Sequence, residues 1–345
     1  MLQNIRSLRG IFVIFIFLSH LEADGSAMMP CGGDCGVAFF MMLSGFVLSA
    51  GYEQKISKGL IGRREFMTRR LKKLYPLHLL CFVWAALLFL PGSSFGAGTA
   101  AKAAINLSML QSWTLLPSYY FSFNAVSWFL SDVMFFYLLF PTAVRLKIVY
   151  RPWFIGAFAA VCLLYICLIP MISDPHANSA VYIFPPSRLL DFMIGMSLWR
   201  LYKARHVISR RFGQLSERQW VTDAVELIAV AVLVIWTAVY DCMPYVYRLG
   251  VYWWPCMATV ILTFSITEGR GGLISRVLAC RPLQRLGSVS FAFYMVHLLC
   301  IESFTRLTTE SGITPSPAAA LVICGTMTLL LAFASHRLPG VRSEK

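Results

Sequence analysis

The sequence predicts an all-α integral membrane protein, a bundle of about ten transmembrane helices with both termini in the cytoplasm. Hydrophobic residues make up 58% of its 345 residues and charged residues only 13%, whereas soluble domains are about a quarter charged. The apolar residues gather in runs close to the roughly 20 residues that cross a bilayer. The basic residues fall mainly on alternate connections between these runs, which the positive-inside rule predicts for a multi-pass protein.

Ten apolar segments follow one another along the chain. They are Ile5–Leu21, Gly36–Gly51, Tyr75–Leu90, Ala125–Pro141, Trp153–Ile172, Phe184–Leu201, Ala224–Tyr240, Val251–Thr267, Gly287–Phe304 and Pro317–Ser335. The stretch Ala100–Trp113 is shorter and more polar, so we expect it to lie at the interface or to re-enter the membrane. No repeat, low-complexity tract or linker is evident in the sequence, and we therefore expect one membrane domain over residues 1–345.

The distribution of basic residues predicts the orientation. With the N-terminus inside, 26 of the 30 Lys and Arg residues fall on the cytoplasmic side. The four outside are Lys102, Arg188, Arg248 and Arg306. This asymmetry and the even number of spans place both termini in the cytoplasm, as expected for a multi-pass protein of the inner (plasma) membrane. The layout also explains the net charge of +14 without a nucleic-acid partner.

Two of the ten cysteines flank a predicted extracytoplasmic turn. Cys31 and Cys35 occur in PCGGDCG, where an oxidising compartment would allow a disulfide. Two free thiols are an equally good interpretation. A metal site is not expected, because two thiols without a nearby histidine supply only half of a tetrahedral set.

The first apolar segment carries an arginine and a histidine on nearly the same face. Arg9 and His20 are eleven positions apart in RGIFVIFIFLSH, close to three helical turns and roughly 16 Å along the axis. This is about half of a hydrocarbon core of roughly 30 Å. A signal peptide also has basic residues before an apolar run, but many further apolar segments follow here. An ionisable residue at this depth is a candidate functional residue.

A second basic cluster precedes Pro76 in FMTRRLKKLYPLH. Arg70 and Lys73 are three positions apart and share a helical face. One interpretation is anchoring at the cytoplasmic membrane surface. The other is a phosphate clamp, because Arg binds phosphate through a bidentate fork and Lys as a point charge. The spacing leaves both open, and a clamp among Arg205–Arg218 is a further possibility.

Polar and aromatic residues also recur at helical spacing further along the chain. One set is Asn124, Trp128 and Asp132, and another is Ser290, Tyr294 and His297. Each set is compatible with satisfied core residues or an aromatic belt at the membrane interface. In PPSRLLDFMIGM, Arg188 and Asp191 are three positions apart and are expected to pair with each other.

In their order along the chain, these motifs resemble the acyltransferase-3 family of integral membrane acyltransferases. The resemblance rests on RGIFVIFIFLSH, GVAFFMMLSGF, the basic pair before YPL, SWFLSD with FFYLLFP, PPSRLLDFMIGM and LGSVSFAFYMVHL. The resemblance covers Ile5 to about Ile301. The chain resembles the stand-alone form of the family, without the extracellular esterase-like domain that many members carry. Two positions depart from the family pattern. Lys73 stands where members usually have a second Arg, and lysine keeps the positive charge but lacks the planar fork of the guanidinium. Asp132 stands where many members have Glu.

The resemblance implies transfer of an acyl group, most often acetyl from acetyl-CoA, to a hydroxyl of a glycan or another cell-envelope molecule. His20 is the candidate general base, or a transient acyl carrier, because neutral His can take the proton of an alcohol near neutral pH. Asp132 is expected to orient His20 or to make a structural hydrogen bond. Phosphate binding is expected of Arg9, Arg70 and Lys73. The residues expected to shape the site are Ser127, Trp128, Arg188, Asp191, Tyr294 and His297, the last more structural than catalytic.

Two alternatives remain at this point. The same fold is compatible with transfer of succinyl or a longer acyl chain. A transporter or flippase of a glycan intermediate also carries buried Asp, Arg and His, although inverted repeats and paired broken helices are not evident in the sequence. The expected partners are the lipid bilayer, acyl-CoA and an envelope acceptor, with no metal and no nucleic acid.

Overall fold

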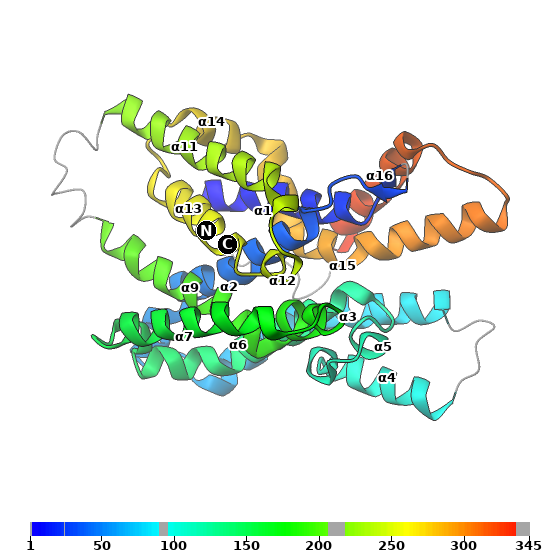
Figure 1. Ribbon diagram of the computed structural model, residues 1–345, viewed down its shortest axis with the longest axis horizontal. Helices are drawn as coiled ribbons and strands as arrows, with labels where there is room; N and C mark the ends of the chain where they lie inside the picture. Colours follow the sequence, from blue (N-terminus) through cyan, green and yellow to red (C-terminus); the bar gives the residue numbers. More distant parts are fainter. Residues whose placement is uncertain (1, 24, 90–95, 206–217, 336–345) are drawn as a thin grey trace.

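The structure is a computed structural model that describes residues 2–23, 25–89, 96–205 and 218–335. Within these ranges the fold is all-α apart from one short antiparallel pair of strands, β1 (Glu22–Ala23) and β2 (Ser26–Ala27). The strands pair Glu22 with Ala27 and Ala23 with Ser26. The predicted all-α fold class is therefore confirmed, and Figure 1 shows the helices gathered into one bundle.

Eight helical segments of the described chain are long and apolar enough to cross a membrane. They are α2 (Gly32–Ser57), α3 (Arg63–Phe89), η2 with α6 (Ala125–Arg145), α7 with η4 (Phe154–Met171), α11 (Gln219–Ala238), α12 with α13 (Tyr245–Ile266), α15 (Arg281–Glu310) and α16 (Pro317–Ser335). The protein is thus a multi-pass membrane protein. Helices α7, α11 and α16 are mostly exposed, as expected for helices that face lipid.

The other two predicted spans also form helices, but each falls short of a spanning helix by length or composition. Helix α1 (Gln3–Ser19) has 17 residues, slightly fewer than a typical span. Helix α9 (Pro185–Lys203) has 19 residues and carries charged residues along its length. These are Arg188, Asp191, Arg200 and Lys203. The structure therefore supports eight of the ten predicted spans by length and hydropathy.

Short elements connect the long helices. They include α4 (Ala97–Leu107), η1 (Gln111–Thr114), α5 (Pro117–Tyr120), η3 (Ile148–Tyr150), α8 (Asp174–Ala177), the π-helix η5 (Asn178–Ile183), η7 (Tyr240–Cys242) and α14 (Leu273–Leu278). Helix α6 itself covers Trp128–Arg145, α12 covers Tyr245–Arg248 and α13 covers Trp253–Ile266. The polar stretch Ala100–Trp113 forms most of α4 with η1, too short to span, as the sequence predicts.

Helices α2 and α9 cross within the bundle (Figure 1), and two glycines allow their close approach. A Cβ atom on Gly45 would lie 2.0 Å from the carbonyl oxygen of Phe192, and one on Gly195 would lie 1.8 Å from that of Met42. Small residues that allow such close backbone approach are typical of helix interfaces in membranes. The crossing holds the polar helix α9 against α2, and α2 is mostly buried.

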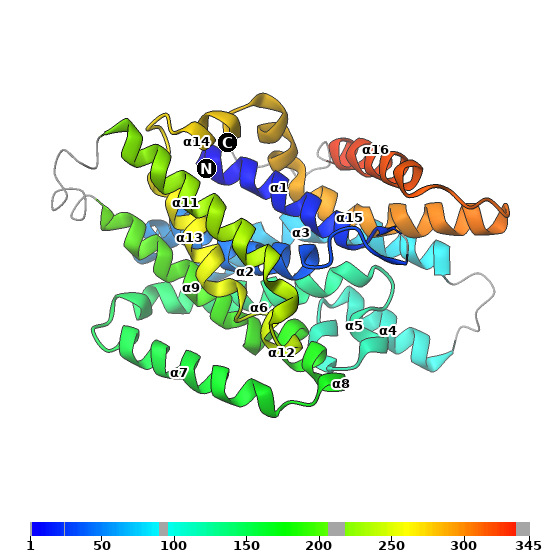
Figure 2. The same cartoon turned by 45° about the horizontal axis from the view of Figure 1, so that its top comes forward.

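Helices α1 and α15 run side by side in the same direction (Figure 2), and they touch through a second pair of glycines. A Cβ on Gly287 would lie 1.7 Å from the carbonyl oxygen of Arg6, and one on Gly10 would lie 3.0 Å from the Gly287 nitrogen. Near the start of both helices, the Gln284 amide donates to the Gln3 carbonyl over 2.7 Å. The parallel direction follows because His20 and His297, at the other end of α1, also approach each other.

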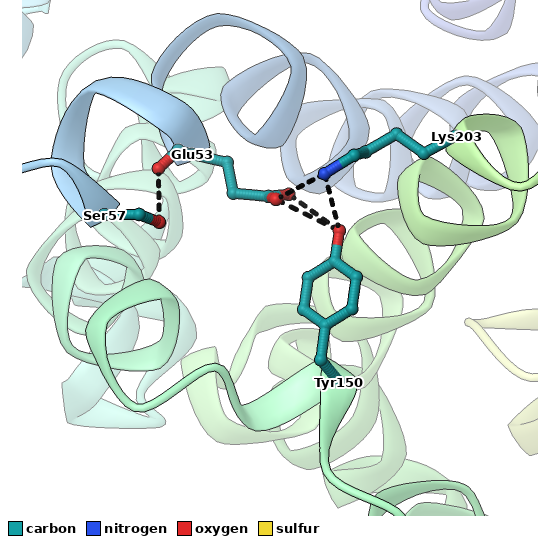
Figure 3. A network of polar contacts seen from close by, with 4 residues as sticks. All are labelled: Glu53, Ser57, Tyr150 and Lys203. Atoms are coloured by element: carbon teal, nitrogen blue, oxygen red, sulfur yellow. Dashed lines mark hydrogen bonds and ion pairs between the residues drawn. The ribbon is translucent and has the colours of Figure 1, made fainter.

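A polar network joins α2, η3 and α9 at the end of the bundle where α2 ends and α3 begins (Figure 3). The Tyr150 hydroxyl donates to both Glu53 carboxylate oxygens, over 3.0 and 3.2 Å, and Lys203 Nζ pairs with Glu53 Oε1 at 3.0 Å. Burial, and then the charge of Glu53, raise the pKa of Tyr150, so the phenol remains a donor. The network fixes the connection between α6 and α7 to the ends of α2 and α9.

Candidate active site

The basic residues singled out in the sequence line a cavity at the amino-terminal end of α1. This cavity, called here the basic pocket, has a volume of about 650 Å³. It lies between α1, α2, α3 and α9, and its cations are Arg6, Arg9, Arg70 and Lys73. A concave site with several positive side chains is suited to a polyanionic ligand.

A smaller cavity, called here the apolar pocket, shares part of its wall with the basic pocket. It measures about 170 Å³ and is lined mainly by apolar side chains. Both cavities are bordered by Val47, Leu48, Arg9, Arg70 and Lys73. The apolar pocket extends toward α6 and α15, where it reaches Ser290 and Tyr294. The three cations expected to bind phosphate therefore lie where a polar and an apolar cavity adjoin.

Arg70 is held in place by aromatic neighbours. Its side chain is buried and donates a hydrogen bond to the Tyr52 hydroxyl. The guanidinium carbon also lies 4.7 Å from the centre of the Tyr52 ring and 6.0 Å from that of Phe66. Cation–π contacts of this kind orient an arginine without neutralising it. The alternative clamp among Arg205–Arg218 falls almost wholly on residues 206–217, outside the described residues, and Arg205 itself donates to the Tyr202 carbonyl.

His20 lies directly after the last residue of α1. Its Nδ1 atom is 2.8 Å from the carbonyl oxygen of Ile16. A carbonyl oxygen only accepts hydrogen bonds, so Nδ1 carries the proton of the neutral ring and Nε2 carries the lone pair. The contact with the preceding turn thus leaves His20 with an unprotonated Nε2, as a general base or nucleophile requires.

A second histidine lies next to His20. The Nε2 atom of His297, in α15, is 3.4 Å from His20 Nδ1, and the ring centres are 5.0 Å apart. The sequence contained a signal for this contact that was missed. The spacing from Gly10 to His20 is ten residues, and so is the spacing from Gly287 to His297. Because the parallel helices touch at the two glycines, equal spacing brings the two histidines to the same level.

The histidine pair is adjacent to the inner end of the apolar pocket but does not line it. Tyr294 borders that pocket, and its ring centre is 5.8 Å from that of His297. The Tyr294 hydroxyl donates to the Val126 carbonyl over 2.8 Å, which joins α15 to the start of α6. His20 is absent from the lining of both pockets, and it is connected to the apolar pocket through its neighbour His297 and, next to that, Tyr294.

Asp132 does not meet His20 in the described part of the chain. Its side chain is fully buried in α6, and neither carboxylate oxygen has a hydrogen-bond partner among the described residues. The expected contact between His20 and Asp132 is therefore not seen, and the titratable side chain next to His20 is His297 instead. Nearby, Trp128 packs its ring 5.1 Å from the Tyr182 ring.

Ser127 and Asn124 help to fix the amino-terminal end of α6. The Ser127 hydroxyl accepts a hydrogen bond from the Gln111 amide over 3.2 Å, which ties η1 to η2. The Asn124 amide donates to the Met295 carbonyl over 2.8 Å. These contacts set how α6 and α15 face each other around Tyr294.

Arg188 and Asp191 pair with each other in α9, as their spacing suggests. Arg188 Nη2 and Asp191 Oδ1 are 3.5 Å apart, and both side chains are only 1% exposed. Arg188 also donates to the Leu249 carbonyl over 2.9 Å, and Trp254 donates to Asp191 over 3.2 Å. The pair thus joins α9 to α13 and the segment before it.

Cys31 and Cys35 are free thiols in the structure. Burial raises the pKa of the Cys31 thiol, which disfavours the thiolate that would bind a metal. No group of three or more possible metal-ligating side chains occurs within the described residues.

Comparison with known proteins gives one family match over nearly the whole chain. A family model described as an acyltransferase domain matches residues 2–337. The chain is 29% identical to the acyltransferase MdmB of Streptomyces mycarofaciens over 336 residues, which covers 89% of this chain and 80% of that protein. No solved structure matches the chain.

Two further relatives are described as enzymes that act on peptidoglycan. The putative peptidoglycan O-acetyltransferase YrhL of Bacillus subtilis is 24% identical over 316 residues, or 86% of this chain and 48% of that protein. The peptidoglycan O-acetyltransferase OatA of Listeria monocytogenes is 24% identical over 322 residues, or 85% and 48%. The chain thus spans about half the length of these two relatives.

Proposed function

The chain belongs to the acyltransferase-3 family, and on that premise we propose that it is a membrane O-acyltransferase that moves acetyl from acetyl-CoA to a hydroxyl of a glycan or another envelope molecule. One observation carries the proposal. The basic and apolar pockets share Arg9, Arg70 and Lys73, and the apolar pocket reaches Tyr294, whose ring centre is 5.8 Å from that of His297. The names of two relatives suggest a peptidoglycan-like acceptor. Acetyl as the acyl group and an envelope glycan as the acceptor are both proposals for this chain.

The residues of the two pockets fit a coenzyme A thioester. The nucleotide end of coenzyme A is polyanionic, and the basic pocket offers arginine and lysine side chains for its phosphates. Arg70 is already oriented by Tyr52, so little side-chain freedom is lost when it binds phosphate. The apolar pocket is suited to the uncharged arm that carries the thioester. We propose that the donor enters with its phosphates in the basic pocket and its acyl end toward Tyr294.

His20 supplies the acid–base chemistry in this proposal. Its Nε2 lone pair takes the proton of the acceptor hydroxyl as the hydroxyl oxygen forms an ester bond to the acyl carbon and the C–S bond breaks. The proton on Nε2 then passes to the coenzyme A thiolate, so that charge and protons balance. In the two-step alternative, Nε2 itself carries the acyl group before the hydroxyl attacks. Both routes require a lone pair on Nε2.

The orientation of the chain gives the reaction its direction. We propose that the basic pocket faces the cytoplasm, where acyl-CoA is found, because most of the Lys and Arg residues fall on that side. His20 lies at the other end of α1, nearer to the extracytoplasmic face. The acyl group then passes from a cytoplasmic donor to an outer acceptor within one protein.

Transfer by the purified protein tests this function. The protein in detergent is incubated with radiolabelled acetyl-CoA and peptidoglycan or capsular glycan fragments, and label in the glycan is measured. We expect label in the glycan with the parent protein and none with His20→Ala. Mass spectrometry of envelope glycans from cells with and without the gene identifies the acceptor by an acetyl-sized difference. A glycan that moves across the membrane without ever being labelled would support a flippase and overturn the proposal.

A further inference from the structure

We propose that His297 positions His20 for catalysis: its Nε2 lone pair accepts a hydrogen bond from His20 Nδ1–H and keeps His20 Nε2 free for the acceptor proton. The inference rests on the proposed function for the role of His20. It assigns to His297 the task that a carboxylate performs in a Ser-His-Asp triad, which is to hold the tautomer and orientation of the imidazole. The sequence had offered Asp132 for this task, with a structural hydrogen bond as an equal alternative.

The hydrogen-bond partners define the proton positions of both rings. His297 Nδ1 is 2.6 Å from the Tyr294 carbonyl oxygen, so Nδ1 carries the proton and Nε2 carries the lone pair. His20 Nδ1 likewise faces the Ile16 carbonyl and carries its proton. The contact of 3.4 Å between His20 Nδ1 and His297 Nε2 therefore joins a donor to an acceptor. The same contact would join two donors if His297 were protonated on both nitrogens, so the geometry requires a neutral His297.

The His20 Nδ1–H group has three neighbouring acceptor atoms. Ile16 O lies at 2.8 Å, and His297 Nε2 and Ser19 Oγ each lie at 3.4 Å; hydrogen bonds shared among acceptors are common at helix termini. When His20 Nε2 takes a proton, the positive charge spreads over both ring nitrogens. The hydrogen bonds that His20 Nδ1–H donates, including the one to His297, then become charge-assisted and roughly twice as strong. His297 thus stabilises the protonated form of His20 more than the resting form.

His297 is itself fixed by aromatic packing. Its side chain is fully buried, the Phe293 ring lies nearly parallel to it at 6.5 Å, and the Phe17 ring meets it edge-on at 6.4 Å. Phe17 and Phe293 also contact each other at 5.7 Å. The imidazole is thus set in an apolar environment that leaves few alternatives for its orientation. A ring fixed on both sides is suited to positioning a neighbour.

Substitutions at His297 separate positioning from packing. In His297→Gln the side-chain oxygen can still accept a hydrogen bond, whereas His297→Leu fills similar space without an acceptor. We expect kcat of His297→Leu to fall about 10- to 100-fold, the loss of one charge-assisted hydrogen bond, with KM for acetyl-CoA unchanged. His297→Gln should recover part, but not all, of the loss. Equal kcat for the two variants, or a change in KM alone, would overturn the inference.

His78 offers a matched control, because it is another buried histidine that contacts a carbonyl, that of Asn106, at 3.0 Å. His78→Gln should keep the parent kcat. Thermal unfolding in detergent is measured for all variants, so that a misfolded protein is recognised. If His297→Leu does not fold, the comparison of His297→Gln with the parent still tests the positioning role. That role predicts that His297→Gln has a lower kcat than the parent but the same stability.

The tautomer of His20 can also be read without any enzyme activity. Nuclear magnetic resonance of isotope-labelled histidines, with His20 assigned by its substitution, should show the proton on Nδ1 in the parent protein. In His297→Leu a fraction with the proton on Nε2 should appear. A proton on Nε2 in the parent would overturn the pairing. If the pairing is present but no preparation transfers acyl groups, the proposed function fails while the contact stands.

Discussion

Replacing Gly287 by alanine should force α1 and α15 apart and separate the two histidines. A Cβ at this position would lie 1.7 Å from the Arg6 carbonyl oxygen, whereas a relaxed C···O contact is roughly 3.3 Å. The helices must therefore part by about 1.6 Å near the crossing. If the displacement persists along α15, the contact between the histidine nitrogens, now 3.4 Å, lengthens to roughly 5 Å and is no hydrogen bond.

The cost in stability should be about 1–3 kcal/mol, the range for an overpacked interior. The assay is thermal unfolding in detergent together with kcat for transfer from acetyl-CoA. Gly10→Ala is the matched control, because its Cβ would lie 3.0 Å from the Gly287 nitrogen and otherwise meets the flexible Leu286 side chain. We expect Gly10→Ala to be much milder in both measurements. Parent-like stability and kcat in Gly287→Ala would refute the close packing of α1 on α15.

Three further predictions concern the site and the topology. His20→Ala should abolish transfer while the protein still inserts, and near-normal product formation would remove His20 from the mechanism. Arg70→Ala should weaken coenzyme A binding by about 10- to 100-fold, the loss of one charge-assisted contact, whereas Lys73→Arg should bind at least as well as the parent. Calorimetry measures both affinities, and an unchanged affinity in Arg70→Ala would place the clamp elsewhere. Single cysteines are introduced at Ser57 and Ser118, both exposed, in a protein variant without its native cysteines. Intact cells that carry the variant are then treated with an impermeant maleimide. Position 118 should react and position 57 should not, and the reverse pattern would contradict the orientation.

The helices could be predicted from the sequence because burial in lipid demands long apolar runs. That signal located eight spanning helices and also the helical segments α1 and α9. It was weakest for α9, where Arg188 and Asp191 lower the mean hydropathy but are paired inside the bundle. A hydropathy pattern does not report such pairing. The sequence analysis also did not predict the polar network of Glu53, Tyr150 and Lys203, because these residues are far apart in the sequence and meet only in the folded bundle.

The candidate site was predictable where one helix carries it and not where two helices meet. The spacing of Arg9 and His20 along α1 required only helical geometry. Whether Asp132 or another side chain meets His20 depended on which helix packs against α1, and His297 was not considered for this position. Charge favoured the carboxylate, whereas the packing of Gly10 on Gly287 places a histidine there. Close glycine contacts, rather than charge, determine which side chains meet in this part of the protein.

The crossing of α1 and α15 connects the two halves of the proposed mechanism. Arg9, which lines both pockets, directly precedes Gly10 at the crossing, and His20 lies at the far end of the same helix. On α15, Ser290 and Tyr294 border the apolar pocket between the crossing and His297. The distance from a donor phosphate to the proposed base is therefore set by two parallel helices whose closest approach is at Gly10 and Gly287. A shift of either helix would change the donor site and the histidine contact together, which is why a methyl group at Gly287 should impair binding and chemistry at once.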